Sequence, residues 1–112
     1  MKIFITATGN DLNSQYDERF GRAKAFMVVE LDTMQIEKYM ENENLNTGHG
    51  VGILTAQIAI ESGADIIIAN RIGPKSMSVI KGTGKKIYQA EGSTIKEVIE
   101  NYKNNKLEEI TS

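Results

Sequence analysis

Hydrophobic and polar residues follow two different periods along the chain, and the period changes near residue 50. Before that point, short apolar runs are separated by polar, turn-rich segments, which predicts strands at residues 3–8, 26–31 and 36–42. The segment "DTMQ" between the second and third runs has hairpin length. We therefore expect the chain to begin with an antiparallel meander.

The third run carries charged residues on both of its faces. In strict alternation Lys38 shares a face with Ile36 and Met40, whereas the opposite face holds Glu37, Tyr39 and Glu41. Charges on both faces hinder pairing with another chain and are typical of a protected sheet edge. We expect residues 36–42 to form an edge strand.

Beyond residue 50 the apolar positions acquire helical spacing. Val51, Leu54 and Ile58 fall on one stripe, and Gly63 follows where a helix commonly ends. The next segment, "ADIIIAN" at residues 64–70, contains three consecutive isoleucines, and a continuous apolar run of this kind is typical of a parallel strand covered on both faces. We expect this strand in the middle of the sheet.

The C-terminal part of the chain repeats the helix and strand signals. Pro74 stands at the first position of a short helix that ends at Gly82 or Gly84, and residues 86–90 form a fifth strand. A capping box that begins at Thr94 then opens a helix with an apolar face at Ile95, Val98, Ile99 and Tyr102. The polar tail is expected to fray from about residue 104.

The resulting order β-β-β-α-β-α-β-α predicts the α/β class, as a three-layer α/β/α fold with a five-stranded mixed sheet and three main helices. A chain of 112 residues is long enough for one core and too short for two, so we expect a single domain over residues 1–112. No apolar segment approaches the roughly 18 residues of a membrane span and no cleavable signal is evident, so we expect a cytoplasmic protein.

Composition narrows the chemistry. A formal net charge of −2 gives no reason to expect nucleic acid or an anionic membrane as a partner. The lack of cysteine excludes disulfides, thiolate nucleophiles and cysteine-ligated metal sites. Any metal must therefore be held through other atoms, and His49 is the only histidine of the chain.

Four loops are expected to meet at one edge of the sheet. If the first three strands form a meander and the later crossovers are right-handed, the first, third, fourth and fifth strands run in the same direction. The loops that follow them, residues 9–22, 43–49, 70–73 and 91–93, then share the rim where open α/β sheets bind ligands. We expect one binding site there.

These loops carry the segments "FGRA", "GHGVG", "NRIGP" and "EGST", each with a glycine, and three of them open predicted helices. Unpaired N–H groups at a helix start attract anions, and glycine lets the backbone approach a ligand closely. Arg22, Arg71 and Lys75 add positive charge. The rim thus indicates an anionic ligand, with His49 as a candidate metal ligand.

Structural explanations for the same residues stay open. A glycine-rich helix entrance can be a tight connection only, and "NRIGP" is also a strand exit before a proline-started helix. His49 can serve as a cap or a solvated side chain. An ion pair with Asp17 or Glu18 would explain Arg22.

Two other functions compete with ligand carriage. A metal-dependent nuclease needs converging carboxylates, but the strand "KIFITA" has none, which leaves as candidates only Asp11, Asp17, Glu18 and Glu91. A sensor or adaptor for a phosphate-containing ligand would use the same glycine loops, although neither GxxxxGKS/T nor GxGxxG is present. We therefore expect binding of an anion and no enzymatic activity.

The whole layout resembles the dinitrogenase iron-molybdenum cofactor biosynthesis family, which includes nitrogenase accessory factors that carry cofactors and relatives of the molybdenum-copper orange protein. The resemblance spans nearly the full chain and rests on "FGRA" at residues 20–23, "HGVG" at 49–52, "IGP" at 72–74 and the closing "AEGSTIKEVIENY". It implies a ribonuclease H-like fold and a role in holding or delivering an anionic metal-sulfur cluster.

On this basis we expect a non-catalytic carrier of a molybdenum/iron or molybdenum/copper sulfide cluster, which exchanges the cluster with donor and acceptor proteins and binds it without a covalent link. The resemblance directs cluster contact to the loop of His49, the expected metal ligand. The other cofactor-binding candidates are rim glycines, rim cations and one phenylalanine: Phe20, Gly21, Arg22, Gly48, Gly50, Gly52, Arg71 and Gly73. The absence of cysteine departs from some cluster-handling relatives and excludes thiolate anchoring.

Overall fold

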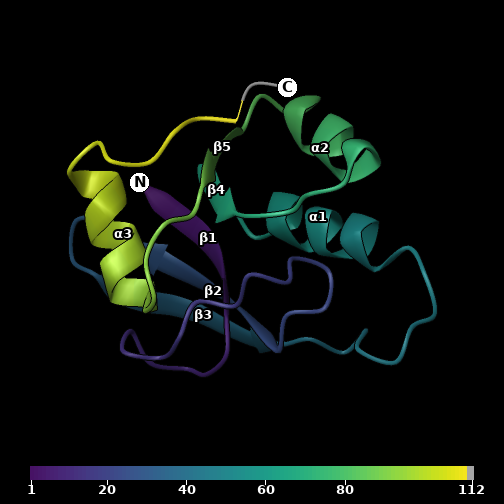
Figure 1. Cartoon of the computed structure of the whole chain (residues 1–112), viewed down its shortest axis with the longest axis horizontal. Coiled ribbons are helices and arrows are strands. Elements are labelled where there is room, and N and C mark those ends of the chain that lie inside the picture. Colours follow the sequence, from purple (N-terminus) through teal and green to yellow (C-terminus); the bar gives the residue numbers. More distant parts are fainter. Residues whose placement is uncertain (111–112) are drawn as a thin grey trace.

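The computed structural model describes residues 1–110 and contains five strands and three helices in the predicted order (Figure 1). The bounds are β1 Lys2–Ala7, β2 Ala25–Glu30, β3 Gln35–Glu41, α1 Val51–Glu61, β4 Ile66–Ala69, α2 Pro74–Lys81, β5 Lys86–Gln89 and α3 Ile95–Lys103. Within the described residues, no helix is both long and apolar enough to span a bilayer.

The five strands form one mixed sheet in the order β3-β2-β1-β4-β5. The pairs β1–β2 and β2–β3 are antiparallel, whereas β1–β4 and β4–β5 are parallel, which confirms the predicted meander and the mixed sheet. β3 lies at one edge, as its charges predicted. β4 is an interior strand between β1 and β5, but the middle of the sheet is occupied by β1, which is equally apolar.

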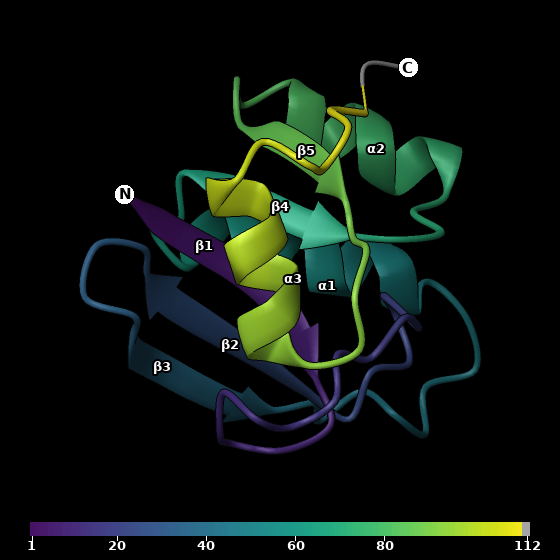
Figure 2. The same ribbon diagram turned by 60° about the vertical axis from the view of Figure 1, so that its left-hand side comes forward.

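Helices cover both faces of the sheet, so the predicted three layers are confirmed. α3 lies over one face, and α1 and α2 lie side by side over the other (Figure 2). The alternation within β1 divides its side chains between two cores: Ile3 and Ile5 pack with Ile95 and Ile99 of α3. Phe4 faces the other way, toward the core that α1 and α2 complete.

β3 departs from strict alternation. A register shift opposite Val28 and Val29 leaves Glu37 without a partner on β2. A bulge of this kind reverses the faces of the residues beyond it. As a result Ile36 and Tyr39 both pack toward α3, while Met40 packs toward α1, so the expected pairing of Ile36 with Met40 on one face was wrong.

The C-terminal segment is ordered through Ile110, so the expected fraying from about residue 104 was wrong for this part. Gln89 N donates to Glu108 O at 2.8 Å and Ile110 N donates to Ile87 O at 2.7 Å. Leu107 is buried in the α3 core. The segment runs along β5 and occupies backbone groups that this edge strand would otherwise expose, which is the reason for its order. Residues 111–112 lie outside the described residues.

Candidate functional site

The carboxyl ends of β1, β3, β4 and β5 lie at the same edge of the sheet, as predicted. The register places Ala7 opposite Ala25 and Ala25 opposite Glu41, so the ends of β1 and β3 are level. The loops after β3, β4 and β5 lead from this edge into α1, α2 and α3, and the loop after β1 leads into β2 (Figure 1). We call this edge and its loops the rim.

Three segments of the rim pack directly on one another. A Cβ atom on Gly21 would lie 2.8 Å from Val51 Cγ2 and 2.9 Å from Gly52 N. A Cβ atom on Gly52 would lie 3.0 Å from Ser76 Oγ. The "FGRA" loop, the first turn of α1 and the first turn of α2 are therefore neighbours, and the prediction that the first two come close together is confirmed.

Arg22 binds the backbone of the His49 loop. Its guanidinium donates to Leu45 O at 2.8 Å and to Gly48 O at 3.3 Å. No ion pair joins Arg22 to Asp17 or Glu18 within the described residues. The arginine that pairs with Asp17 is Arg19, so the structural explanation considered for Arg22 was assigned to the wrong residue.

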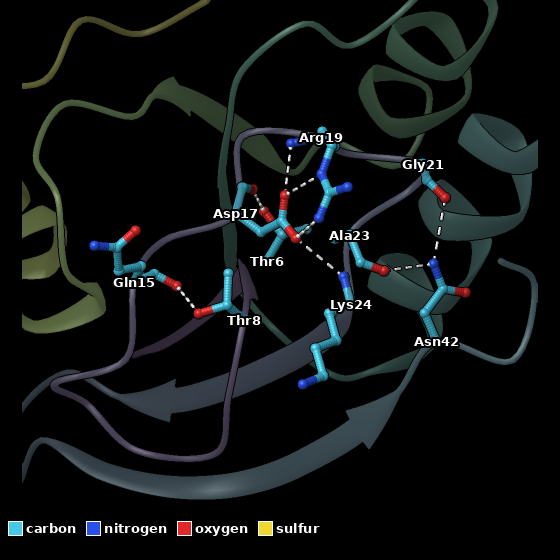
Figure 3. A network of polar contacts seen from close by, with 9 residues as sticks. All are labelled: Thr6, Thr8, Gln15, Asp17, Arg19, Gly21, Ala23, Lys24 and Asn42. Atoms are coloured by element: carbon cyan, nitrogen blue, oxygen red, sulfur yellow. Dashed lines mark hydrogen bonds and ion pairs between the residues drawn. The ribbon is translucent and has the colours of Figure 1, made fainter.

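A buried carboxylate holds the loop that carries Gly21 and Arg22 (Figure 3). Asp17 is 3% exposed and accepts hydrogen bonds from Arg19 N, Nε and Nη2 and from Lys24 N. Burial alone would raise the pKa of Asp17, but the hydrogen bonds from Arg19 and Lys24 prevail and hold this pKa below its usual range. Sequence reasoning weighed Asp17 only as a weak nuclease candidate and missed this anchoring role.

Asn42 ties the end of β3 to the same loop. Its Nδ2 donates to Ala23 O at 2.8 Å and to Gly21 O at 3.3 Å (Figure 3), and its Oδ1 accepts from Asn44 N at 2.9 Å. The side chain is buried. Sequence reasoning did not select Asn42, although an asparagine at a strand end commonly organises the turn that follows.

The three helix starts at the rim differ in how their N–H groups are satisfied. The N-cap residues of α1 and α2 are Gly50, with φ 76°, and Gly73, and neither helix has a side-chain cap. The first backbone bonds join Leu54 N to Gly50 O and Met77 N to Gly73 O. Within residues 1–110 the earlier N–H groups, those of residues 51–53 in α1 and 75–76 in α2, are free of protein acceptors, and Pro74 has no N–H.

The start of α3 is closed. Thr94 Oγ1 accepts from Glu97 N at 3.1 Å, and the N–H groups of Ile95 and Lys96 donate to carbonyl groups of the β1 loop. The "EGST" loop, expected to contribute to the rim, therefore has no free helix start. An anion would meet uncapped N–H groups at α1 and α2 only, where the helix dipole favours negative charge.

Several predicted site residues surround these two helix starts on the surface. His49, Arg71 and Lys75 are exposed, and Arg22 is half-buried. Gly48 and Gly73 have open space where a side chain would stand. In contrast, the Phe20 side chain is 3% exposed and belongs to the core beneath α1 and α2, so this residue offers a ligand only its backbone.

Asn70 and Tyr16 hold the backbone next to Arg71 in place. Its φ of 55° lies in the left-handed region, immediately after Asn70. Asn70 accepts from Tyr16 Oη at 2.7 Å and donates to Ala90 O at 3.3 Å. Burial raises the pKa of Tyr16, so its hydroxyl stays protonated and available as the donor.

The rim offers little for a bare metal ion. Within residues 1–110, no group of three or more histidine, aspartate and glutamate side chains is placed to hold one. A groove between β3 and α1, lined in part by Met40, Glu43 and Ile58, contains none of the predicted site residues. The geometry therefore suits an anion at an open surface, contacted by backbone N–H groups, cations and one imidazole.

Comparison with known proteins identifies the family of this chain. The family model described as dinitrogenase iron-molybdenum cofactor matches residues 1–105. An uncharacterised protein of Methanocaldococcus jannaschii is 36% identical over 110 residues, which are 96% of this chain and 90% of that protein.

Solved structures share the fold. The apo form of the orange protein from Desulfovibrio gigas superposes with a TM-score of 0.90 at 32% identity, covering 99% of this chain and 93% of that one. A NifB-like protein from Thermotoga superposes with a TM-score of 0.81 at 30% identity, covering 99% and 94%. The family match spans nearly the whole chain, and this protein therefore belongs to the dinitrogenase iron-molybdenum cofactor family.

Proposed function

We propose that the protein is a non-catalytic carrier that binds a preassembled, anionic metal-sulfur cluster at the rim. The observation that carries this proposal is the adjacency of two uncapped helix starts, those of α1 and α2, which meet where Gly52 contacts Ser76. Two positive helix ends side by side favour an anion more strongly than either end alone.

The residues around these helix starts suit a cluster with sulfide on its surface. Backbone N–H groups and the side chains of Arg71 and Lys75 would contact the sulfides, and the exposed His49 imidazole would coordinate one metal atom. Contacts of this kind recognise a finished cluster and need no thiolate, which this chain lacks. A cluster bound through many weak contacts can also be released intact.

Arg22 has a supporting role in this proposal. Two of its donors hold the carbonyl groups of Leu45 and Gly48, which keeps the loop of His49 next to the "FGRA" segment. Within the described residues no carboxylate pairs with Arg22, so no ion pair neutralises its charge. Arg22 therefore both shapes the loop and adds to its positive potential.

The family and the similar structures support a cargo of the iron-molybdenum type. The family description names that cofactor. We propose a molybdenum/iron or molybdenum/copper sulfide as the cargo, received from a donor protein and passed to an acceptor protein during cofactor assembly or metal handling.

Anaerobic loading of the purified protein tests the proposal. The protein is incubated with tetrathiomolybdate, alone or with copper(I), and in parallel with iron and sulfide, then desalted and analysed for metal content and absorbance. Retention of molybdenum or iron near one cluster per chain, with a charge-transfer spectrum, is expected. Background metal content in all samples would contradict carriage.

One alternative rests on the same observation, because uncapped helix starts bind phosphate as readily as other anions. On that reading the domain is a sensor or adaptor for a phosphate-containing ligand. Inorganic phosphate and nucleotides are therefore titrated against the unloaded protein. Tight phosphate binding together with no retention of thiomolybdate would select the alternative.

A further inference from the structure

Ser76 is a buried polar residue whose hydroxyl has no hydrogen-bond partner in residues 1–110. The residue is 4% exposed and lies in the first turn of α2. Two other buried hydroxyls are paired within the protein: Ser62 Oγ donates to Ala59 O at 2.6 Å, and Thr6 Oγ1 donates to Asp17 O at 2.5 Å. Ser76 therefore holds a hydrogen-bond donor, in a nearly buried side chain, that no protein group in residues 1–110 uses.

The location of Ser76 supplies that explanation. Its Oγ lies 3.0 Å from the position of a Cβ on Gly52, in the seam between the first turns of α1 and α2. Bonds from Cα to Cβ in a helix tilt toward the N-terminus, so this side chain leans toward the rim. Since every fully enclosed side-chain nitrogen and oxygen in residues 1–110 has a partner, the unpaired Ser76 oxygen is not fully enclosed and keeps some contact with solvent.

We infer that the Ser76 hydroxyl is a ligand-binding group, which donates a hydrogen bond to a sulfido or oxo atom of an anion seated over the starts of α1 and α2. This inference rests on the proposed function and adds to it a specific donor in the seam. A hydroxyl suits this task because it can donate to a terminal sulfide or oxide without displacing it from its metal.

The glycine at position 52 belongs to the same arrangement. A side chain there would come 3.0 Å from Ser76 Oγ and would press into the seam. Glycine keeps the seam accessible while the two helix starts stay in contact. Gly52 and Ser76 therefore act together: Gly52 leaves the space through which the ligand reaches the seam, and Ser76 donates the hydrogen bond.

The test compares tetrathiomolybdate binding by the unmodified protein, Ser76→Ala and Ser78→Ala. Ser78 lies on the same helix but is exposed, so it is the matched control. We expect Ser76→Ala to bind about tenfold more weakly, as for a lost hydrogen bond to a charged group, and Ser78→Ala to bind like the unmodified protein. Thermal unfolding should show Ser76→Ala to be at least as stable as the unmodified protein, because no internal hydrogen bond is lost.

A second variant gives an independent reading. The chain contains no cysteine, so Ser76→Cys places a single thiol in the seam. Tetrathiomolybdate should slow alkylation of that thiol by iodoacetamide, whereas a thiol introduced by Ser78→Cys should react at the same rate with and without it.

The outcomes separate the two proposals. Equal binding by Ser76→Ala and the unmodified protein, or a thiol at position 76 that the anion does not protect, would overturn the role of Ser76 and leave the carrier function standing. Failure of the unmodified protein to retain any metal-sulfur species would overturn the carrier function and the role of Ser76 with it.

Discussion

The backbone of Gly21 lies against that of Gly52, so closely that a Cβ on Gly21 would stand 2.9 Å from Gly52 N. The two glycines are 31 positions apart in the sequence and belong to a loop and to a helix. Their contact brings the loop after β1 against the start of α1. The shape of the candidate site thus depends on the absence of a side chain at position 21.

Gly21→Ala should destabilise the fold and displace the start of α1. Overpacking of one methyl group costs about 1–3 kcal/mol when the neighbours are backbone atoms that cannot turn away. Urea unfolding measures the loss. Gly48→Ala is the control, since nothing lies within 4 Å of that position and the change should cost less than about 0.5 kcal/mol. Equal stability of the two variants would show that the loop can retreat from α1.

Arg22→Ala should weaken cluster retention while leaving most of the fold intact. The guanidinium holds Leu45 O and Gly48 O, so its removal should also speed hydrogen exchange in residues 43–49. Arg22→Lys keeps the charge but not the planar pair of donors, which separates the two effects. Retention that stays unchanged in both variants across a range of salt concentrations would limit Arg22 to a structural role.

His49→Ala should keep the content of helix and strand and markedly reduce retention of a molybdenum- or iron-containing cluster. The side chain is exposed and precedes α1, so its loss removes a ligand without opening the core. Asn46→Ala, at another exposed position of the same loop, is the matched control. Metal-to-protein ratios after desalting decide the matter: equal ratios for His49→Ala and the unmodified protein would make the loop a helix entrance only.

Asp17 should contribute stability that is lost in acid. Its pKa is depressed in the folded protein by the bonds from Arg19 and Lys24, so its contribution is fully present above the unfolded-state pKa of about 3.9 and disappears as pH falls through the folded value. Asp17→Asn should cost about 1–3 kcal/mol at pH 7 and flatten the decline of stability below about pH 4. Glu18→Gln, which is exposed, should change neither.

The C-terminal segment should stabilise the domain through Leu107. Truncation of this buried side chain in Leu107→Ala should cost about 2 kcal/mol, at the low end for a buried leucine because the site lies near the surface. Glu108→Ala keeps the backbone bond to Gln89 and is the control. Equal unfolding midpoints for the two variants would show that residues 107–110 do not contribute to the stability of the domain.

The sequence by itself determined the elements of this protein and the direction of its strands. Alternating and helical spacings are local properties, because they follow from how successive side chains leave a strand or a helix. The capping box at Thr94 and the proline at position 74 were sufficient to locate two helix starts. The shared rim followed from the handedness of the crossovers, which needs no knowledge of side-chain packing.

The tertiary structure alone decided which parts of the rim are available to a ligand. The sequence showed three glycine-bearing helix starts, but only contacts with the β1 loop close the start of α3. The same limit applies to Arg22, whose carbonyl partners are more than 20 positions away, and to the C-terminal segment, whose order depends on the free edge of β5. Ser76 illustrates this limit most clearly. It is buried because α1, which is distant in sequence, packs against it, and no local pattern distinguishes it from the exposed Ser78.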